Sequence, residues 1–127
     1  MKHAGEIFLE GRARRNMFAT YDEFWSAVRR QVGDRAGNPW RQIPQLLRQI
    51  GEDSIRDTGL ALGAIVVADE PDPHPSEGFF RLAAREGILA ESEAPDPGAE
   101  WNRMTRPQRE FWQDQVTRIF GRYGLPE

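Results

Sequence analysis

The sequence predicts a single α+β domain, residues 1–127, that is mainly helical, with about four helices around a small sheet of two or three strands. The chain length of 127 residues is close to the commonest size of one domain. Hydrophobic residues make up 39% of the chain and aromatic residues 10%, which is enough to build a core. Several segments carry apolar residues at helical spacing, whereas one continuous apolar run is typical of a buried strand.

The first helix is predicted to begin at a capping box. In Thr20-Tyr21-Asp22-Glu23, the side chains of the first and fourth residues can each bond the other's backbone N–H group. Apolar residues follow at helical spacing up to Gly33, where we expect the helix to end. These residues are Tyr21, Phe24, Trp25, Val28 and Val32.

A second helix is predicted after a turn-rich connector over residues 33–42, in which Trp40 is the only large anchor. Pro44 suits the first turn of a helix because proline has no N–H group to donate. We expect this helix to end at Gly51 or to continue to Ile55. Its apolar positions are Ile43, Leu46, Leu47 and Ile50.

Residues 60–67 are predicted to form a buried strand, because they are rich in β-branched residues and apolar at both odd and even positions. A lone buried strand would leave backbone N–H and C=O groups without partners. We therefore expect it to pair with residues 6–9 or with residues 87–90.

Two loops flank the predicted third helix. Three prolines in residues 69–75 predict an exposed loop, after which Ser76 can cap a helix that ends at Gly87. Residues 91–100 are acidic, contain proline and glycine and lack apolar periodicity, so they also predict a loop. We expect flexible acidic segments near 69–76 and 91–100.

The last helix is predicted to start at Thr105, which with Gln108 forms a second capping motif, and to end near Gly121 or Gly124. Its apolar side chains make a wide stripe. The predicted core of the whole domain consists of Phe24, Val28, Leu46, Leu47, Ile50, Leu62, Ile65, Val67, Phe79, Leu82, Trp112, Val116, Ile119 and Phe120.

Composition argues against several classes of chemistry, so we expect no cofactor and no enzyme activity. The chain has no cysteine, which removes disulfides and thiolate chemistry, and its only lysine is Lys2. No apolar run approaches the roughly twenty residues of a membrane span, and the N-terminus lacks the pattern of a secretory signal, so we expect a cytoplasmic protein without membrane contact. Prolines interrupt the acids near His74, so no metal site is expected.

The charge distribution suggests an interaction protein. The net charge is −3, but residues 60–100 hold nine acidic residues against two arginines. A concentrated negative potential can steer a basic partner, so we expect an accessory, antitoxin or immunity-type factor that binds a basic protein. Phe79 and Phe80 are adjacent, so one narrow helix face cannot bury both. Burial of both between helices is the commoner outcome, and the alternative is that one of them is exposed beside the acidic loop and contacts a partner. The candidate partner-binding residues are Asp69, Glu70, Asp72, Phe80, Glu91, Glu93, Asp96 and Glu100.

Arginines supply the alternative function, a nucleic-acid-binding accessory factor. Trp101, Arg103, Arg106 and Arg109 form the densest basic and aromatic cluster, and guanidinium groups beside an indole can hold a phosphate or a base. A second basic group, Arg12, Arg14 and Arg15, would extend this surface if the N-terminus packs against the last helix. The acidic balance of the chain argues against duplex binding.

One stretch resembles other proteins. Around residues 60–89 the chain has Gly-Ala-Ile-Val-Val, a proline, Gly-Phe-Phe-Arg-Leu-Ala and Gly-Ile-Leu, which is similar to a stretch of small uncharacterised bacterial proteins. This resemblance implies no activity. The order helix, helix, strand is also similar to part of a winged-helix domain, which is the alternative fold, although a basic recognition helix is missing.

Overall fold

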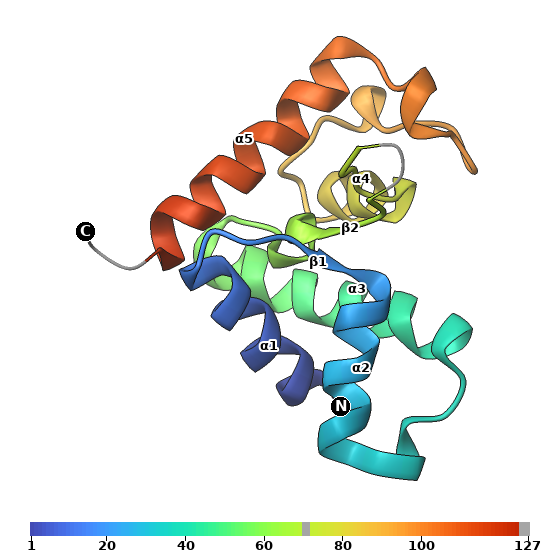
Figure 1. Ribbon diagram of the computed structural model, residues 1–127. Helices are drawn as coiled ribbons and strands as arrows, with labels where there is room; N and C mark the ends of the chain where they lie inside the picture. Colours follow the sequence, from blue (N-terminus) through green and yellow to red (C-terminus); the bar gives the residue numbers. More distant parts are fainter. Residues whose placement is uncertain (70–71, 125–127) are drawn as a thin grey trace.

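Five α-helices and one two-stranded sheet make up the described part of the chain, residues 1–69 and 72–124, in this computed structural model (Figure 1). The fold is therefore mainly helical α+β, with one helix more than the sequence predicts. The elements are α1 (Lys2–Arg14), β1 (Ala19–Thr20), α2 (Tyr21–Val32), α3 (Pro39–Thr58), β2 (Val66–Val67), α4 (Glu77–Arg85) and α5 (Arg106–Tyr123). Short 3-10 helices are η1 (Gly33–Ala36), η2 (Leu62–Ile65), η3 (Glu91–Glu93) and η4 (Trp101–Arg103).

Both predicted capping motifs start helices. The Thr20 hydroxyl accepts from Glu23 N–H at 3.1 Å, and Glu23 Oε1 accepts from Thr20 N–H at 3.0 Å. Thr105 and Gln108 make the same reciprocal pair at the start of α5. α2 ends at Gly33 and α5 ends at Gly124, and both glycines are among the helix ends that the sequence predicts.

α1 corrects the interpretation of the N-terminus, because residues 6–9 lie in a helix and not in a strand. Ile7, Phe8 and Leu9 are consecutive, so their spacing does not favour either structure. In the helix, Leu9 is fully buried whereas Ile7 is exposed. Lys2 is held by an ion pair with Asp53 at 2.6 Å.

α3 begins earlier than predicted. Asn38 accepts from Trp40 N–H at 2.9 Å and caps the helix, so Pro44 lies inside it and not in its first turn. Trp40 does not anchor the connector, since 87% of it is exposed. The consequence is a large apolar side chain on the surface at the start of α3.

The sheet is small and parallel, with Ala19 opposite Val66 and Thr20 opposite Val67. Neither predicted partner of the central strand is used, because residues 6–9 are helical and residues 87–90 lie in the turn after α4. Parallel pairing requires a crossover, which α2, α3 and η2 provide. In Figure 1 the sheet lies centrally, with α1, α2 and α3 on one side and α4 and α5 on the other.

Most of the predicted strand 60–67 is not extended, since residues 62–65 form η2. Side chains replace the missing strand partner. Gln115 Oε1 accepts from Ala61 N–H at 2.9 Å, and Trp112 Nε1 donates to the Ala64 carbonyl at 2.8 Å. Ser54 Oγ accepts from Leu62 N–H at 2.9 Å. Buried backbone groups are thus satisfied without a third strand.

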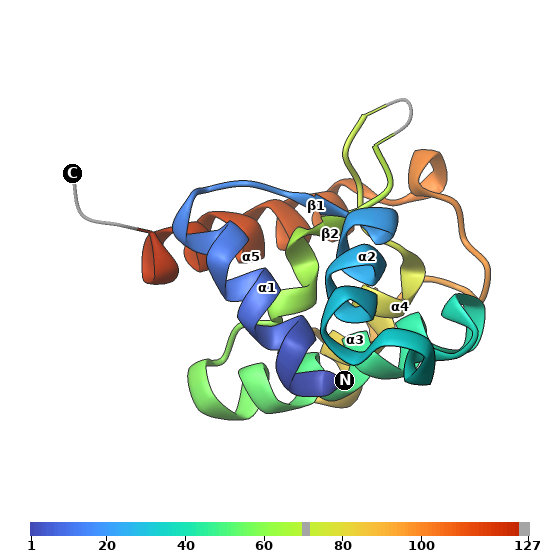
Figure 2. The ribbon, with the colours of Figure 1, turned by 60° about the horizontal axis from the view of Figure 1, so that its bottom comes forward.

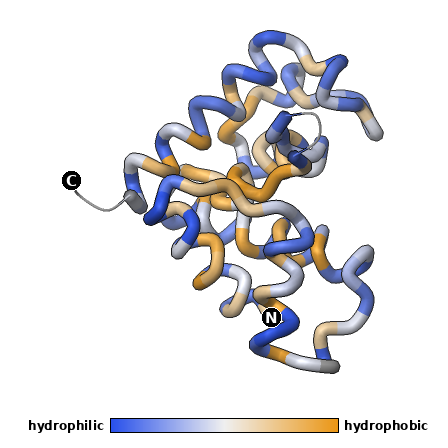
Figure 3. Tube along the Cα trace, viewed as in Figure 1, coloured by the Kyte–Doolittle hydropathy of each residue, from blue (hydrophilic) through white to orange (hydrophobic). Residues whose placement is uncertain are grey.

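The core follows the predicted list with few differences. Leu47 and Phe120 are only partly buried, whereas the other twelve residues of that list are buried. Phe79 and Phe80 are both buried and pack edge-to-face on each other, so Phe80 is wrong as a partner-binding residue. Figure 3 shows hydrophobic residues gathered along the central segments.

Candidate functional site

The structure brings the two acidic loops together through an aromatic stack. Ala68 and His74 form an antiparallel bridge that closes the first loop, with N–H···O distances of 3.0 Å in both directions. The His74 ring stacks on Trp101, with ring centres 5.9 Å apart and an angle of 13° between planes. Figure 2 shows this loop beside η4. Residues before α4 and before α5 therefore share one surface.

The candidate carboxylates are mostly free. Among the described residues, Asp69, Asp72, Glu91, Asp96 and Glu100 are exposed and form no ion pair. Glu93 is half-buried, and its carbonyl accepts from Gln108 Nε2 at 2.8 Å. Glu70 lies outside the described residues. We call the five exposed carboxylates the acidic surface.

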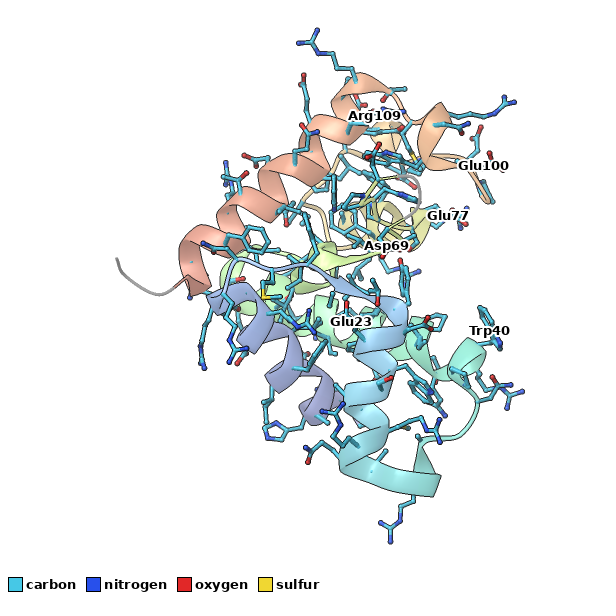
Figure 4. The ribbon with its side chains drawn as sticks, viewed as in Figure 1. Glu23, Trp40, Asp69, Glu77, Glu100 and Arg109 are labelled. Carbon is cyan, nitrogen blue, oxygen red and sulfur yellow. The ribbon has the colours of Figure 1, made fainter. Side chains whose placement is uncertain are left out.

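Glu77 is a site residue that sequence reasoning missed. Its carboxylate accepts from Gly98 N–H at 2.9 Å and from Arg81 Nε at 2.7 Å, so it ties the second loop to α4. Figure 4 shows Glu77 and Glu100 on the same side of the molecule. From the sequence, a glutamate in the first turn of a helix is explained by its favourable interaction with the helix dipole. Nothing in the sequence indicates that Glu77 also binds the backbone of the second loop.

The arginine cluster of the alternative function is divided by the fold. Arg109 donates to the carbonyls of Trp101 at 2.9 Å and Met104 at 3.2 Å, and its guanidinium lies 4.9 Å from the Trp101 ring centre. Arg106 pairs with Glu110 at 2.7 Å on the exposed helix face. Arg103 is exposed. Arg109 and the half-buried Trp101 thus stabilise the turn before α5.

The N-terminal arginines do not extend that cluster. Arg12 pairs with Glu23 at 2.9 Å and donates to the Phe18 carbonyl at 3.1 Å. Arg14 and Arg15 follow at the end of α1 and are exposed. This end of α1 lies near the C-terminal end of α5, because Phe18 in the following segment packs on Phe120. The 18 residues of α5 span about 27 Å, so the two basic groups lie far apart.

A large apolar groove lies between α2, α3 and α4, and sequence reasoning did not find it. Its volume is about 670 Å³. The exposed Trp40 lies on its rim, and in Figure 4 this side chain projects from the start of α3. The groove is lined by Tyr21, Asp22, Trp25, Pro39, Trp40, Ile43, Pro44, Leu47, Arg48, Ala61, Gly63, Val66, Ser76, Gly78, Phe79, Arg81, Leu82 and Arg85.

Polar groups of the groove are few and unevenly placed. Asp22 lies on the α2 edge, whereas Arg48, Arg81 and Arg85 lie on the α3 and α4 edge. Burial raises the pKa of the Tyr21 phenol, and hydrogen bonds with Ser76 oppose that rise. The phenol is therefore neutral and can donate or accept a hydrogen bond.

A second, smaller cleft of about 220 Å³ lies where α1, α3 and the end of α5 meet. Its lining includes Glu6, Glu10, Asp53 and Asp57, and Lys2 pairs with Asp53 at its edge. Among residues 1–69 and 72–124, no group of three or more His, Asp or Glu side chains is placed to hold a metal ion.

No protein-family model, curated protein or solved structure matches this chain. None of the described helices is both long enough and apolar enough to cross a bilayer.

Proposed function

We propose that this protein is a cytoplasmic, non-enzymatic interaction protein, an accessory, antitoxin or immunity-type factor, that binds a basic protein partner through its two acidic loops. The observation that carries the proposal is the stack of His74 on Trp101. It holds the loop after β2 beside the loop before α5, so that carboxylates from both can act on one partner.

Electrostatics supports this role for the acidic surface. Its five carboxylates have no cationic partner among the described residues, so their field is not cancelled locally. Exposed charges of one sign accelerate association with an oppositely charged partner, and salt weakens that effect. The acidic surface is thus suited to steering a basic partner.

The test is isolation of complexes from the organism that encodes the protein, with two matched double variants. Asp69→Lys with Glu100→Lys reverses the acidic surface. Asp57→Lys with Asp114→Lys reverses the same number of exposed carboxylates on α3 and α5. We expect a basic protein to co-purify with the native chain and the control, and not with the first variant. Its association rate should fall as salt rises.

Two outcomes count against the proposal. One is that both double variants retain the partner equally. The other is binding of labelled duplex DNA at low salt that weakens in Arg103→Ala and Arg106→Ala variants, which would favour the nucleic-acid alternative.

A further inference from the structure

The groove has the dimensions and lining of a small-molecule site. Its volume of about 670 Å³ falls inside the range of roughly 300–1,000 Å³ that such sites occupy. Three helices form its walls, and η2 with β2 forms its floor. The walls are mainly apolar, with Trp25, Leu47 and Phe79 among the larger side chains.

Several backbone groups of the floor are already bonded: the Ala61 carbonyl accepts from Ala64 N–H, and the Gly63 carbonyl accepts from Val66 N–H. Ala61 N–H is bonded by Gln115 of α5, so this donor is already occupied. Gly63 adds a position without a side chain, and a Cβ atom built there would meet only Leu47 Cδ2, at 4.0 Å. The centre of the groove therefore favours a hydrocarbon occupant.

The arginines that line the groove belong to two of its three helices, α3 and α4. Gly51 of α3 approaches Leu82 of α4, so the helices that carry Arg48, Arg81 and Arg85 are in contact. Arg81 is engaged by Glu77 at 2.7 Å. Arg48 and Glu52 are 3.8 Å apart, longer than a hydrogen bond, and Arg85 has no carboxylate partner among the described residues.

We propose that the groove binds a single-chain amphiphile with a carboxylate head, such as a medium-chain fatty acid. The hydrocarbon chain lies between Trp25, Leu47 and Phe79, and the carboxylate meets the guanidinium groups of Arg85 and Arg48. Guanidinium and carboxylate match in charge and in fork geometry. This site is separate from the acidic surface, so either proposal can fail without the other.

The first experiment titrates the full-length protein with octanoate, decanoate and dodecanoate, below the concentrations at which they form micelles. Calorimetry gives the affinity and stoichiometry, and tryptophan emission reports the place, since Trp25 and Trp40 line the groove whereas Trp101 and Trp112 do not. We expect one molecule per chain. Each added methylene should tighten binding about fourfold, because burying it contributes about 0.8 kcal/mol.

Variants then test the two ends of the ligand separately. Gly63→Leu places a side chain on the groove floor and should abolish dodecanoate binding. Gly121→Leu is the control, since a Cβ there meets nothing within 4 Å and α5 carries it outside the groove.

Arg85→Gln tests the carboxylate end. It should weaken the affinity for dodecanoate by as much as about fivefold and leave the affinity for dodecanol unchanged. The exposed Arg14 gives the matched Arg14→Gln control.

Thermal unfolding of Gly63→Leu establishes that the variant is folded. Absence of dodecanoate binding would overturn the proposal. So would an affinity independent of chain length, or one that Gly63→Leu leaves intact in a folded protein. A dimer that Trp40→Ala dissociates, in a chain that binds no dodecanoate, would assign the groove to a second copy of the protein.

Discussion

Two glycines on α1 should respond in opposite ways to the same substitution. Gly5 is buried at the contact of α1 with α2 and α3, whereas Gly11, further along the same helix, has nothing within 4 Å of a Cβ atom. A Cβ atom at Gly5 would lie 2.9 Å from Ile50 Cδ1 and 3.0 Å from Phe24 Cε2. Both neighbours are buried almost completely, so neither can turn toward solvent.

The magnitude follows from two opposing contributions. Alanine in place of glycine inside a helix stabilises the fold by about 0.5–1 kcal/mol. Gly11→Ala should show that gain alone. Gly5→Ala adds overpacking, which costs roughly 1–3 kcal/mol, so its net effect is a loss of up to about 2.5 kcal/mol. The free energies of unfolding of the two variants should differ by about 1–3 kcal/mol.

Urea denaturation followed by far-ultraviolet circular dichroism measures this difference. Ile50→Val removes the methyl group nearest Gly5, so it should reduce the cost of Gly5→Ala in a double-mutant cycle. Equal stabilisation by Gly5→Ala and Gly11→Ala would refute the reasoning, because it would mean that α1 does not approach Ile50 and Phe24 closely.

Three further predictions concern hydrogen bonds. Trp112→Phe removes the donor to the buried Ala64 carbonyl, and it should lower the free energy of unfolding by about 1–3 kcal/mol in urea titrations. Gln115→Leu leaves Ala61 N–H without an acceptor and should cost a similar amount, measured in the same way. The pKa of Glu23 lies below its usual value of 4.5, chiefly because the Thr20 N–H group donates to its carboxylate and secondly because Arg12 does. The stability this provides is present above pH 4.5 and is lost as the pH falls below that value, so Glu23→Gln should flatten the acid limb of a stability-against-pH curve.

The sequence predicted the elements whose signals are local. Thr20 with Glu23 and Thr105 with Gln108 mark the starts of α2 and α5, because a capping motif depends only on residues within one turn. α1 lacks any such mark: no side chain caps its first residue, and no acid lies in its first turn. It is helical because Gly5, Leu9 and Ala13 bury one face in the fold, which is a tertiary cause.

The candidate site was predictable only in part. The acidic residues of the loops after β2 and before α5 are visible in the sequence, but their association depends on the stack of His74 and Trp101, which are far apart along the chain. The sequence predicts Trp101 and Arg109 as members of one ligand-binding cluster. In the fold, Arg109 lies against the Trp101 ring and stabilises the turn, because its guanidinium reaches two backbone carbonyls.

The groove could not be predicted from any one segment, and its existence depends on how residues 60–67 satisfy their backbone. A fully paired strand there would have needed a neighbouring strand, which would have taken space beside Val66. Instead, Gln115 and Trp112 of α5 bond Ala61 and Ala64. The segment is thereby held against α5, and Ala61, with Val66, is left to form an apolar floor between α2 and α4. The hydrogen bonds that replace the strand partner thus leave the space that the proposed amphiphile occupies.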